Sequence, residues 1–203
     1  MMTLTGIIEN FNEAKCLYYR KSRALTTAKS LALAFVMASF TALTARICVK
    51  LPFTPVPVTG QVFGVLLSGV VCGGLFGSVS QIIYVALAAS GLPWFAFGAR
   101  GSLNYLLGPT GGYLLGFIIA PLIIGYFTDA RGRNQRFIPQ TAAMLAGAAV
   151  IYFCGAGYLA YLLKYSFAEA VTKGILPFIF IDIVKVFLAG ALSSFILPKK
   201  TFE

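Results

Sequence analysis

Histidine is absent from this 203-residue sequence, and acidic residues are scarce, with 6 Asp and Glu against 16 Lys and Arg. Without histidine, the chain has no His-based catalytic triad and no site in which His binds a metal. It also lacks the nucleotide-binding pattern G-x-x-x-x-G-K-[ST] and the serine-hydrolase pattern G-x-S-x-G. We therefore expect a protein that is not an enzyme and that carries no metal and no cofactor.

Cysteine is also rare, and its four copies at positions 16, 48, 72 and 154 show no metal-ligand spacing. Three of them lie in or beside apolar stretches, where cysteine behaves as a small hydrophobic residue. We expect no disulfide and no zinc site. Residues 1–23 are mostly polar and have no apolar core of a signal peptide, so we expect the first hydrophobic segment to be retained.

Apolar sequence, in contrast, is abundant: 59% of the residues are hydrophobic and the mean hydropathy is +0.86. These values are typical of membrane proteins. In a soluble protein, the net charge of +10 would indicate a nucleic-acid partner. Here the basic residues cluster in the N-terminal segment and in loops between apolar spans. The positive-inside rule explains that distribution, so we expect contact with membrane lipid and none with nucleic acid.

The pattern predicts an all-α integral membrane protein, with a basic tail at 1–23 and a six-helix transmembrane domain at 24–200. The apolar stretch 62–89 would be ~42 Å long as one helix, which exceeds a bilayer core. A glycine cluster in its middle, Gly73, Gly74 and Gly77, therefore predicts two short helices joined by a tight turn. The other predicted spans run from residue 24 or 31 to 49, and over 109–127, 139–163 and 176–197.

Basic clusters occur in the N-terminal segment, at 131–136 and at 199–200. The positive-inside rule places all three in the cytoplasm, which requires an even number of spans between successive clusters. Six spans satisfy this condition, with both termini cytoplasmic. Two irregular segments, 51–61 with three prolines and 90–108 with the only tryptophan, then face outward.

The last span contains an acid and a base, Asp182 and Lys185, three residues apart and hence on one helix face. A charge within the bilayer costs several kcal/mol unless it is paired or faces a polar cavity. Two interpretations remain open at this point. The residues form either an ion pair that locks this helix to a neighbour or a polar binding site inside the bundle.

Four sequence segments carry a family resemblance: PVPVTGQVFGVLLSG at 55–69, GLPWF at 91–95, GPTGGYLLGF at 108–117, and the final D-x-x-K. In this order and spacing they closely resemble the BioY family, the biotin-binding S components of energy-coupling-factor (ECF) vitamin transporters. The resemblance implies a six-helix membrane protein that binds biotin from outside. It also implies an ATPase pair and a transmembrane coupling protein as partners.

The family docks the coupling protein through an Ala-x-x-x-Ala pattern in its first helix. The resemblance therefore implies two alternative docking sets here: Ala24, Ala28 and Ala32, or Ala34, Ala38 and Ala42.

The chain departs from the family pattern in three places. Arg100, Asn104 and Tyr105 interrupt the glycine-rich run that precedes GPTGG, Phe180 and Ile181 replace a Pro-Gly pair before Asp182, and a basic N-terminal extension is added. The first departure affects the loop over the ligand, and the second affects the direction of the Asp182 side chain.

Biotin offers two ureido N–H donors, one carbonyl acceptor and a terminal carboxylate. An ionised Asp182 accepts N–H donors, and Lys185 or Arg100 would meet the carboxylate. Aromatic side chains such as Trp94 would pack the rings and the aliphatic chain. The complete predicted substrate site comprises Asp182, Lys185, Arg100, Asn104, Tyr84, Trp94, Gly111, Gly112, Tyr113, Thr59 and Gln61. The alternatives are an S component for another vitamin, a stand-alone secondary transporter of biotin, or a structural membrane protein.

Overall fold

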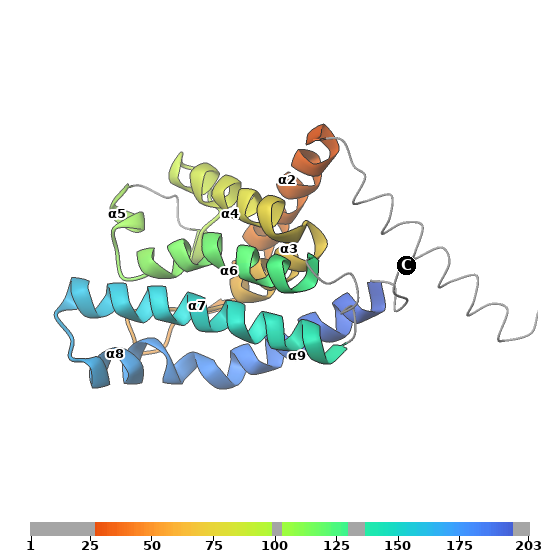
Figure 1. Ribbon diagram of the computed structural model, residues 1–203. Coiled ribbons are helices and arrows are strands. Elements are labelled where there is room, and N and C mark those ends of the chain that lie inside the picture. Colours follow the sequence, from red (N-terminus) through yellow and green to blue (C-terminus); the bar gives the residue numbers. More distant parts are fainter. Residues whose placement is uncertain (1–26, 99–102, 130–136, 197–203) are drawn as a thin grey trace, which may run out of the picture.

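The computed structural model of the chain describes residues 27–98, 103–129 and 137–196, and it shows an all-α architecture with one very short β ribbon (Figure 1). The helices are α2 (Thr27–Thr44), α3 (Gln61–Val71), α4 (Gly73–Ala89), α5 (Leu103–Leu106), α6 (Gly111–Asp129), α7 (Phe137–Leu163), α8 (Phe167–Gly174) and α9 (Leu176–Ile196). The ribbon consists of β1 (Cys48–Val49) and β2 (Val58–Thr59), and a 3-10 turn, η1, covers Ala96–Gly98.

Four helices, α2, α6, α7 and α9, are long and apolar enough to cross a membrane. They bury only part of their own surface, and many large apolar side chains on them face outward, as Phe153 on α7 does with 83% of its surface exposed. Outward-facing apolar side chains on long helices are what a lipid environment requires. The chain is therefore a multi-pass membrane protein.

The expected division of 62–89 into two helices is confirmed, with α3 ending at Val71 and α4 beginning at Gly73. Gly73 has a φ of +77°, a left-handed conformation that glycine adopts without steric cost. At 1.5 Å per residue, α3 is about 17 Å long and α4 about 26 Å long, so both are shorter than a full span.

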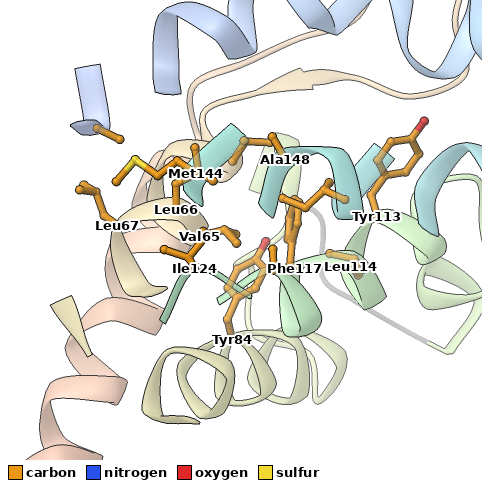
Figure 2. Packing of buried hydrophobic residues seen from close by; sticks show 14 of the residues in the cluster. Val65, Leu66, Leu67, Tyr84, Tyr113, Leu114, Phe117, Ile124, Met144 and Ala148 are labelled. Atoms are coloured by element: carbon orange, nitrogen blue, oxygen red, sulfur yellow. The ribbon is translucent and has the colours of Figure 1, made fainter. Parts of the chain in front are cut away.

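Helix α3 lies at the centre of the bundle and packs against α2, α4, α6, α7 and α9. Figure 2 shows Val65 and Leu66 of α3 meeting Ile124 of α6 and Met144 of α7. The short α3 is therefore a core element whose N-terminal residue, Gln61, begins inside the protein, where it is 7% exposed. That buried start places polar groups within reach of α9.

The first span is shorter than predicted, because α2 ends at Thr44 rather than at residue 49. Cys48 and Val49 instead pair with Thr59 and Val58 in an antiparallel ribbon. The β-branched residues here favour extended structure, and the prolines of the following loop keep the returning chain extended. The predicted outer loop is thus held beside the end of α2.

The predicted polar connector 164–173 contains a helix, α8, that the sequence analysis missed. Its start is a capping box in which the Ser166 hydroxyl accepts from the Glu169 backbone N–H, and the Glu169 carboxylate accepts from the Ser166 backbone N–H at 2.9 Å. These hydrogen bonds from Ser166 lower the pKa of Glu169 below its usual value. The S-x-x-E signature was present in the sequence and would have predicted the helix start.

The helix ends gather at two ends of the bundle (Figure 1). Helix α6 ends and α7 begins at the right of the view, where α9 also ends, whereas α5 and α8 lie at the left. Helix α4 runs from beside α3 toward the end that carries α5. The loop before α3 is fixed to the α8 end of the bundle, because the Thr54 hydroxyl donates to the Lys173 carbonyl at 2.6 Å.

Candidate substrate-binding cavity

A cavity lies between α3, α6, α7 and α9, beneath the loop that precedes α3. Together with the open space at its mouth, it contains about 540 Å³ that protein atoms do not fill. Its lining comprises Val56, Pro57, Thr59, Gln61, Val62, Tyr105, Thr110, Tyr113, Leu114, Phe117, Ile151, Tyr152, Phe178, Asp182 and Lys185.

One side of the cavity is a charged cluster built on α9. The Lys185 ammonium donates to Asp182 Oδ1 at 2.5 Å and to the Thr59 carbonyl at 2.6 Å. The hydroxyl of Tyr152, from α7, donates to Asp182 Oδ2 at 2.7 Å. The Asp182 and Lys185 side chains are only 7% and 14% exposed. Burial of both charges together, with hydrogen bonds to each, is what makes an ion pair tolerable in an apolar bundle.

A second polar layer lies beside this cluster, at the start of α3. The Thr59 hydroxyl donates to Gln61 Oε1 at 2.7 Å, and the Gln61 amide donates to the Tyr84 hydroxyl. Tyr84 is fully buried and stacks on Trp94, with ring centroids 6.4 Å apart and an interplanar angle of 16°. Tyr84 and Trp94 therefore support the Gln61 side chain from behind.

The remaining walls are mostly apolar. Phe117 from α6, Ile151 from α7 and Phe178 from α9 line the cavity, and all three are nearly fully buried. Tyr105 forms part of the wall near α5, where its ring stacks on Phe95 at a centroid distance of 4.3 Å. A cavity with one charged side and apolar walls suits a small molecule that combines a polar group with an aliphatic or cyclic body.

Of the predicted site residues, the structure brings five together in the cavity wall: Asp182, Lys185, Thr59, Gln61 and Tyr113. The Tyr113 hydroxyl donates to the Gly174 carbonyl at 2.7 Å, and in Figure 2 it points away from the labelled core residues.

The other predicted site residues lie elsewhere or are not described. Tyr84 and Trp94 lie behind the wall and are not among its lining residues. Gly111 and Gly112 lie at the start of α6, where a Cβ on Gly112 would meet Tyr158 and the Cys154 carbonyl of α7. Arg100 and the side chain of Asn104 lie outside the described residues.

Sequence reasoning missed several lining residues, including Tyr152, Thr110 and Phe178. Phe178 had a usable signal, because it precedes Asp182 by four residues and shares its helix face. The sequence signal for Tyr152 was weaker. A tyrosine within an apolar span requires a hydrogen-bond partner for its hydroxyl, and Asp182 is the only acidic residue within the predicted spans. That partner is on a different helix, 30 residues further along the chain.

The fold defines a multi-pass membrane protein, and its bundle encloses a cavity with one charged side. The BioY family model matches residues 19–200, which is most of the chain. The chain belongs to the BioY family, as the resemblance noted above implied.

The chain is 42% identical over 143 residues to a "Probable biotin transporter BioY" of Methanothermobacter thermautotrophicus, covering 67% of this chain and 90% of that protein. It is 36% identical over 145 residues to a "Biotin transporter BioY" of Thermotoga maritima, covering 71% and 83%. Among solved structures, it resembles the S-component for biotin from an ECF-type ABC transporter, with a TM-score of 0.76 and 26% identity. That likeness covers 84% of this chain and 93% of the other. These similar proteins are transporters or transport components rather than enzymes.

The two alanine sets proposed for partner docking differ in exposure. Ala34, Ala38 and Ala42 are 0%, 0% and 6% exposed and pack inside the bundle. Ala28 and Ala32 are exposed on the outer side of α2, and Ala24 lies outside the described residues.

Proposed function

We propose that this chain is the substrate-binding membrane subunit of an ECF-type transporter and that its ligand is biotin. The observation that carries this proposal is the buried Asp182–Lys185 pair at the side of an apolar-walled cavity, in a chain of the BioY family. Relatives named as biotin transporters support the choice of ligand.

The chemistry of the cavity matches the ring end of biotin. An ionised carboxylate has about four acceptor positions, and Asp182 uses one for Lys185 and one for Tyr152. Positions remain for the ureido N–H groups. The Tyr152 hydroxyl and the Lys185 ammonium are donors within the same cluster, and either suits the ureido carbonyl. The walls formed by Phe117, Ile151 and Phe178 would pack the fused rings.

We also propose six membrane-crossing segments, with α3 and α4 as the two short ones and both termini in the cytoplasm. The clustering of the α6, α7 and α9 ends at one end of the bundle supports this topology, because the basic clusters follow or precede those ends in the sequence. The cavity and the loop before α3 then lie toward the outside.

We propose an ATPase pair and a transmembrane coupling protein as partners, and the likeness to the S-component of an ECF-type ABC transporter supports this proposal. The given sequence contains no G-x-x-x-x-G-K-[ST] motif, so in such a complex a separate protein would hydrolyse ATP. Exposed small residues allow close approach of another helix in lipid, so Ala28 and Ala32 on α2 are the better-placed docking set.

Titration of the purified protein with radiolabelled biotin tests the proposal. We expect saturable binding at one site per chain, which unlabelled biotin displaces and other small vitamins do not. Displacement by a different vitamin would favour an S component of other specificity. Biotin accumulation in sealed vesicles by this protein alone, without ATP, would favour a secondary transporter.

A further inference from the structure

A chain of hydrogen bonds leads from the charged cluster of the cavity to the loop that carries Trp94. The Lys185 ammonium donates to the Thr59 carbonyl at 2.6 Å, and the Thr59 hydroxyl donates to Gln61 Oε1 at 2.7 Å. The amide nitrogen of Gln61 donates to the Tyr84 hydroxyl, which donates to the Trp94 carbonyl at 3.4 Å. Tyr84 and Trp94 do not line the cavity, so the chain extends behind its wall.

The direction of donation along this chain is determined at its Trp94 end. A backbone carbonyl can only accept, so the Tyr84 hydroxyl gives its proton to Trp94 and its oxygen is left to accept. The Gln61 amide therefore turns its nitrogen toward Tyr84 and its oxygen toward Thr59. The Thr59 hydroxyl fits the same direction, because its oxygen accepts from the Gln61 backbone N–H at 3.4 Å and its proton goes to Gln61 Oε1. An amide flipped end for end would take the Tyr84 proton away from the Trp94 carbonyl.

Tyr84 is held in place by the packing of its ring. Its side chain is fully buried, and its ring stacks on Trp94 and meets Phe95 edge-on, with centroids 5.9 Å apart and an interplanar angle of 90°. Neither ring contact uses the hydroxyl. Phenylalanine at this position would therefore keep the aromatic packing and remove only the oxygen that receives the Gln61 amide.

The orientation of the Gln61 amide determines what this residue offers to a ligand. A side-chain amide has two N–H donors, and among the residues that the structure describes only the Tyr84 hydroxyl accepts from it. Because Gln61 lines the cavity, its second N–H is available there as a donor. Lys185 uses two of its three N–H groups, on Asp182 and on the Thr59 carbonyl, and offers the third. These two donors, joined through Thr59, suit an acceptor oxygen, whereas Asp182 suits N–H groups.

We propose that Tyr84 is a positioning residue for ligand selection. By fixing the orientation of the Gln61 amide, it makes the cavity favour a ring that carries a carbonyl oxygen over a ring that carries N–H at the same place. The inference rests on the proposed function and deepens it, because the ureido ring of biotin has its oxygen between two N–H groups. Asp182 accepts from the N–H groups, and Gln61 donates to the oxygen. Tyr84 does not touch the ligand and acts through Gln61.

The test compares biotin with 2-iminobiotin, whose ring has a C=N–H group in place of the carbonyl and, when protonated, offers only N–H donors there. Dissociation constants for both ligands are measured at neutral pH on the purified parent protein and on four variants: Tyr84→Phe, Gln61→Met, the double variant and Tyr158→Phe. Tyr158→Phe is the matched control. The Tyr158 hydroxyl also donates to a backbone carbonyl, that of Leu107 at 3.0 Å, but this residue does not line the cavity.

We expect the parent protein to prefer biotin and Tyr84→Phe to lose about tenfold of that preference, the effect of one neutral hydrogen bond. With phenylalanine, both orientations of the Gln61 amide leave a polar atom against the ring, so neither is favoured. Gln61→Met removes the amide and should lower the preference to a similar extent. The double variant should show no further loss, because Tyr84 acts through Gln61. Tyr158→Phe should keep the parent preference.

Equal weakening of both ligands in Tyr84→Phe, with the preference unchanged, would assign Tyr84 to packing alone and overturn the inference. Losses that add in the double variant would overturn it too, because Tyr84 would then act by another route than Gln61. An equal loss in Tyr158→Phe, or a parent protein that binds both ligands equally, would have the same consequence. If Tyr84→Phe does not fold, Gln61→Met decides, and a parent-like preference there overturns the inference. Failure of the parent protein to bind biotin would instead reject the proposed function itself.

Discussion

Asp182 and Lys185 bring opposite charges into the apolar interior, and each has a second partner from elsewhere in the fold. Tyr152 of α7 donates to the carboxylate, and the Thr59 carbonyl accepts from the ammonium. The pair thus joins α9 to α7 and to the loop before α3. The same contacts fit both interpretations that the sequence left open, a helix lock and a binding site, so a measurement must separate binding from stability.

We expect Asp182→Asn to weaken biotin binding by about 2–4 kcal/mol, because the new amide donor opposes a ureido N–H and leaves a buried polar group unpaired. Lys185→Met leaves the Asp182 charge buried without its cation, which should lower the melting temperature. The double variant removes both charges and should recover much of that stability. Biotin affinity and melting temperature are measured for all three variants.

Lost affinity in well-folded Asp182→Asn protein, not recovered in the double variant, supports a ligand-binding role. Unchanged affinity, with a lowered melting temperature that the double variant restores, would assign the pair to a purely structural lock and remove Asp182 from the site.

Gln81 is another fully buried polar residue, and it lies among hydroxyl groups of three helices. Its amide nitrogen contacts the hydroxyls of Ser68, Ser80 and Thr41, yet each of those hydroxyls donates to a backbone carbonyl of its own helix. Among the described residues, no group donates to Gln81 Oε1.

We therefore expect Gln81→Met to be tolerated, although it removes three contacts. Methionine preserves most of the volume, leaves no hydroxyl without an acceptor and removes a carbonyl that lacks a donor. The expected change in unfolding free energy is within about 1 kcal/mol, of either sign, measured by thermal or denaturant unfolding in detergent. A loss well above this value would show that the amide is a net stabilising link between α2, α3 and α4.

At the scale of helices, the contact between α6 and α7 depends on glycine. A Cβ added at Gly112 would collide with Tyr158 and with the Cys154 carbonyl, whereas Gly157, on the exposed side of α7, has no other atom within 4 Å of such a Cβ. We expect Gly112→Val to destabilise the protein by about 1–3 kcal/mol through overpacking. Gly157→Val, the matched control, should change stability far less.

Both glycine variants are compared by thermal unfolding and by biotin affinity. Reduced affinity in Gly112→Val at a temperature where the protein is folded, with an unchanged melting temperature, would contradict the packing role. It would instead favour the alternative that the Gly112 backbone contacts the ligand.

The helices were largely predictable because their signals are local. Long apolar runs predicted the bounds of α6, α7 and α9 to within a few residues. Gly73 marked the break between α3 and α4, because the turn there needs a left-handed backbone conformation that glycine adopts easily. The predicted end of the first span, residue 49, was wrong because Cys48–Val49 pair with Val58–Thr59 in a ribbon instead of continuing the helix. A two-residue strand has no periodicity that the sequence could reveal.

The cavity was predictable only where a residue conflicted with its surroundings. Asp182 and Lys185 were found because charges in an apolar span require an explanation. Phe117 and Ile151 gave no such signal, because the sequence pattern of an apolar residue in an apolar helix is the same whether the side chain faces lipid, the protein core or a ligand. Gly111 and Gly112 were named with the site from their motif, but their backbone neighbours come from the crossing of α6 and α7, which linear sequence does not encode.

For the molecule as a whole, the six-span topology predicts that successive loops lie on alternate sides of the membrane. Reporter fusions that end at residues 75 and 133 should both read as cytoplasmic, because the basic cluster at 131–136 and the break at Gly73 fall on the same side. Fusions that end at residues 50 and 165 should read as external and serve as controls. An external signal at 75 or 133 would reject six spans with cytoplasmic termini.

The docking surface that we propose for the coupling protein lies on α2, and its residues do not line the cavity. Ala28 and Ala32 are exposed, whereas Ala38 is fully buried against the rest of the bundle. We expect Ala28→Trp and Ala32→Trp to abolish most ATP-dependent biotin uptake, because a large side chain prevents close approach of a partner helix. Biotin affinity should change less than about threefold, since surface substitutions away from a site shift free energies by about 0.5 kcal/mol or less. Leu145→Trp, on the exposed side of α7, is the control and should transport normally.

Ala38→Trp separates docking from folding, because it overpacks the interior and should lower the melting temperature in the isolated chain. Uptake is measured in cells that also produce the ATPase pair and the coupling protein, and assembly is followed by co-purification. Normal co-purification and uptake for both exposed-alanine variants would exclude this face of α2 as the docking surface. Uptake without any partner would go further and remove the need for a docking surface at all, because the chain would then be a stand-alone transporter.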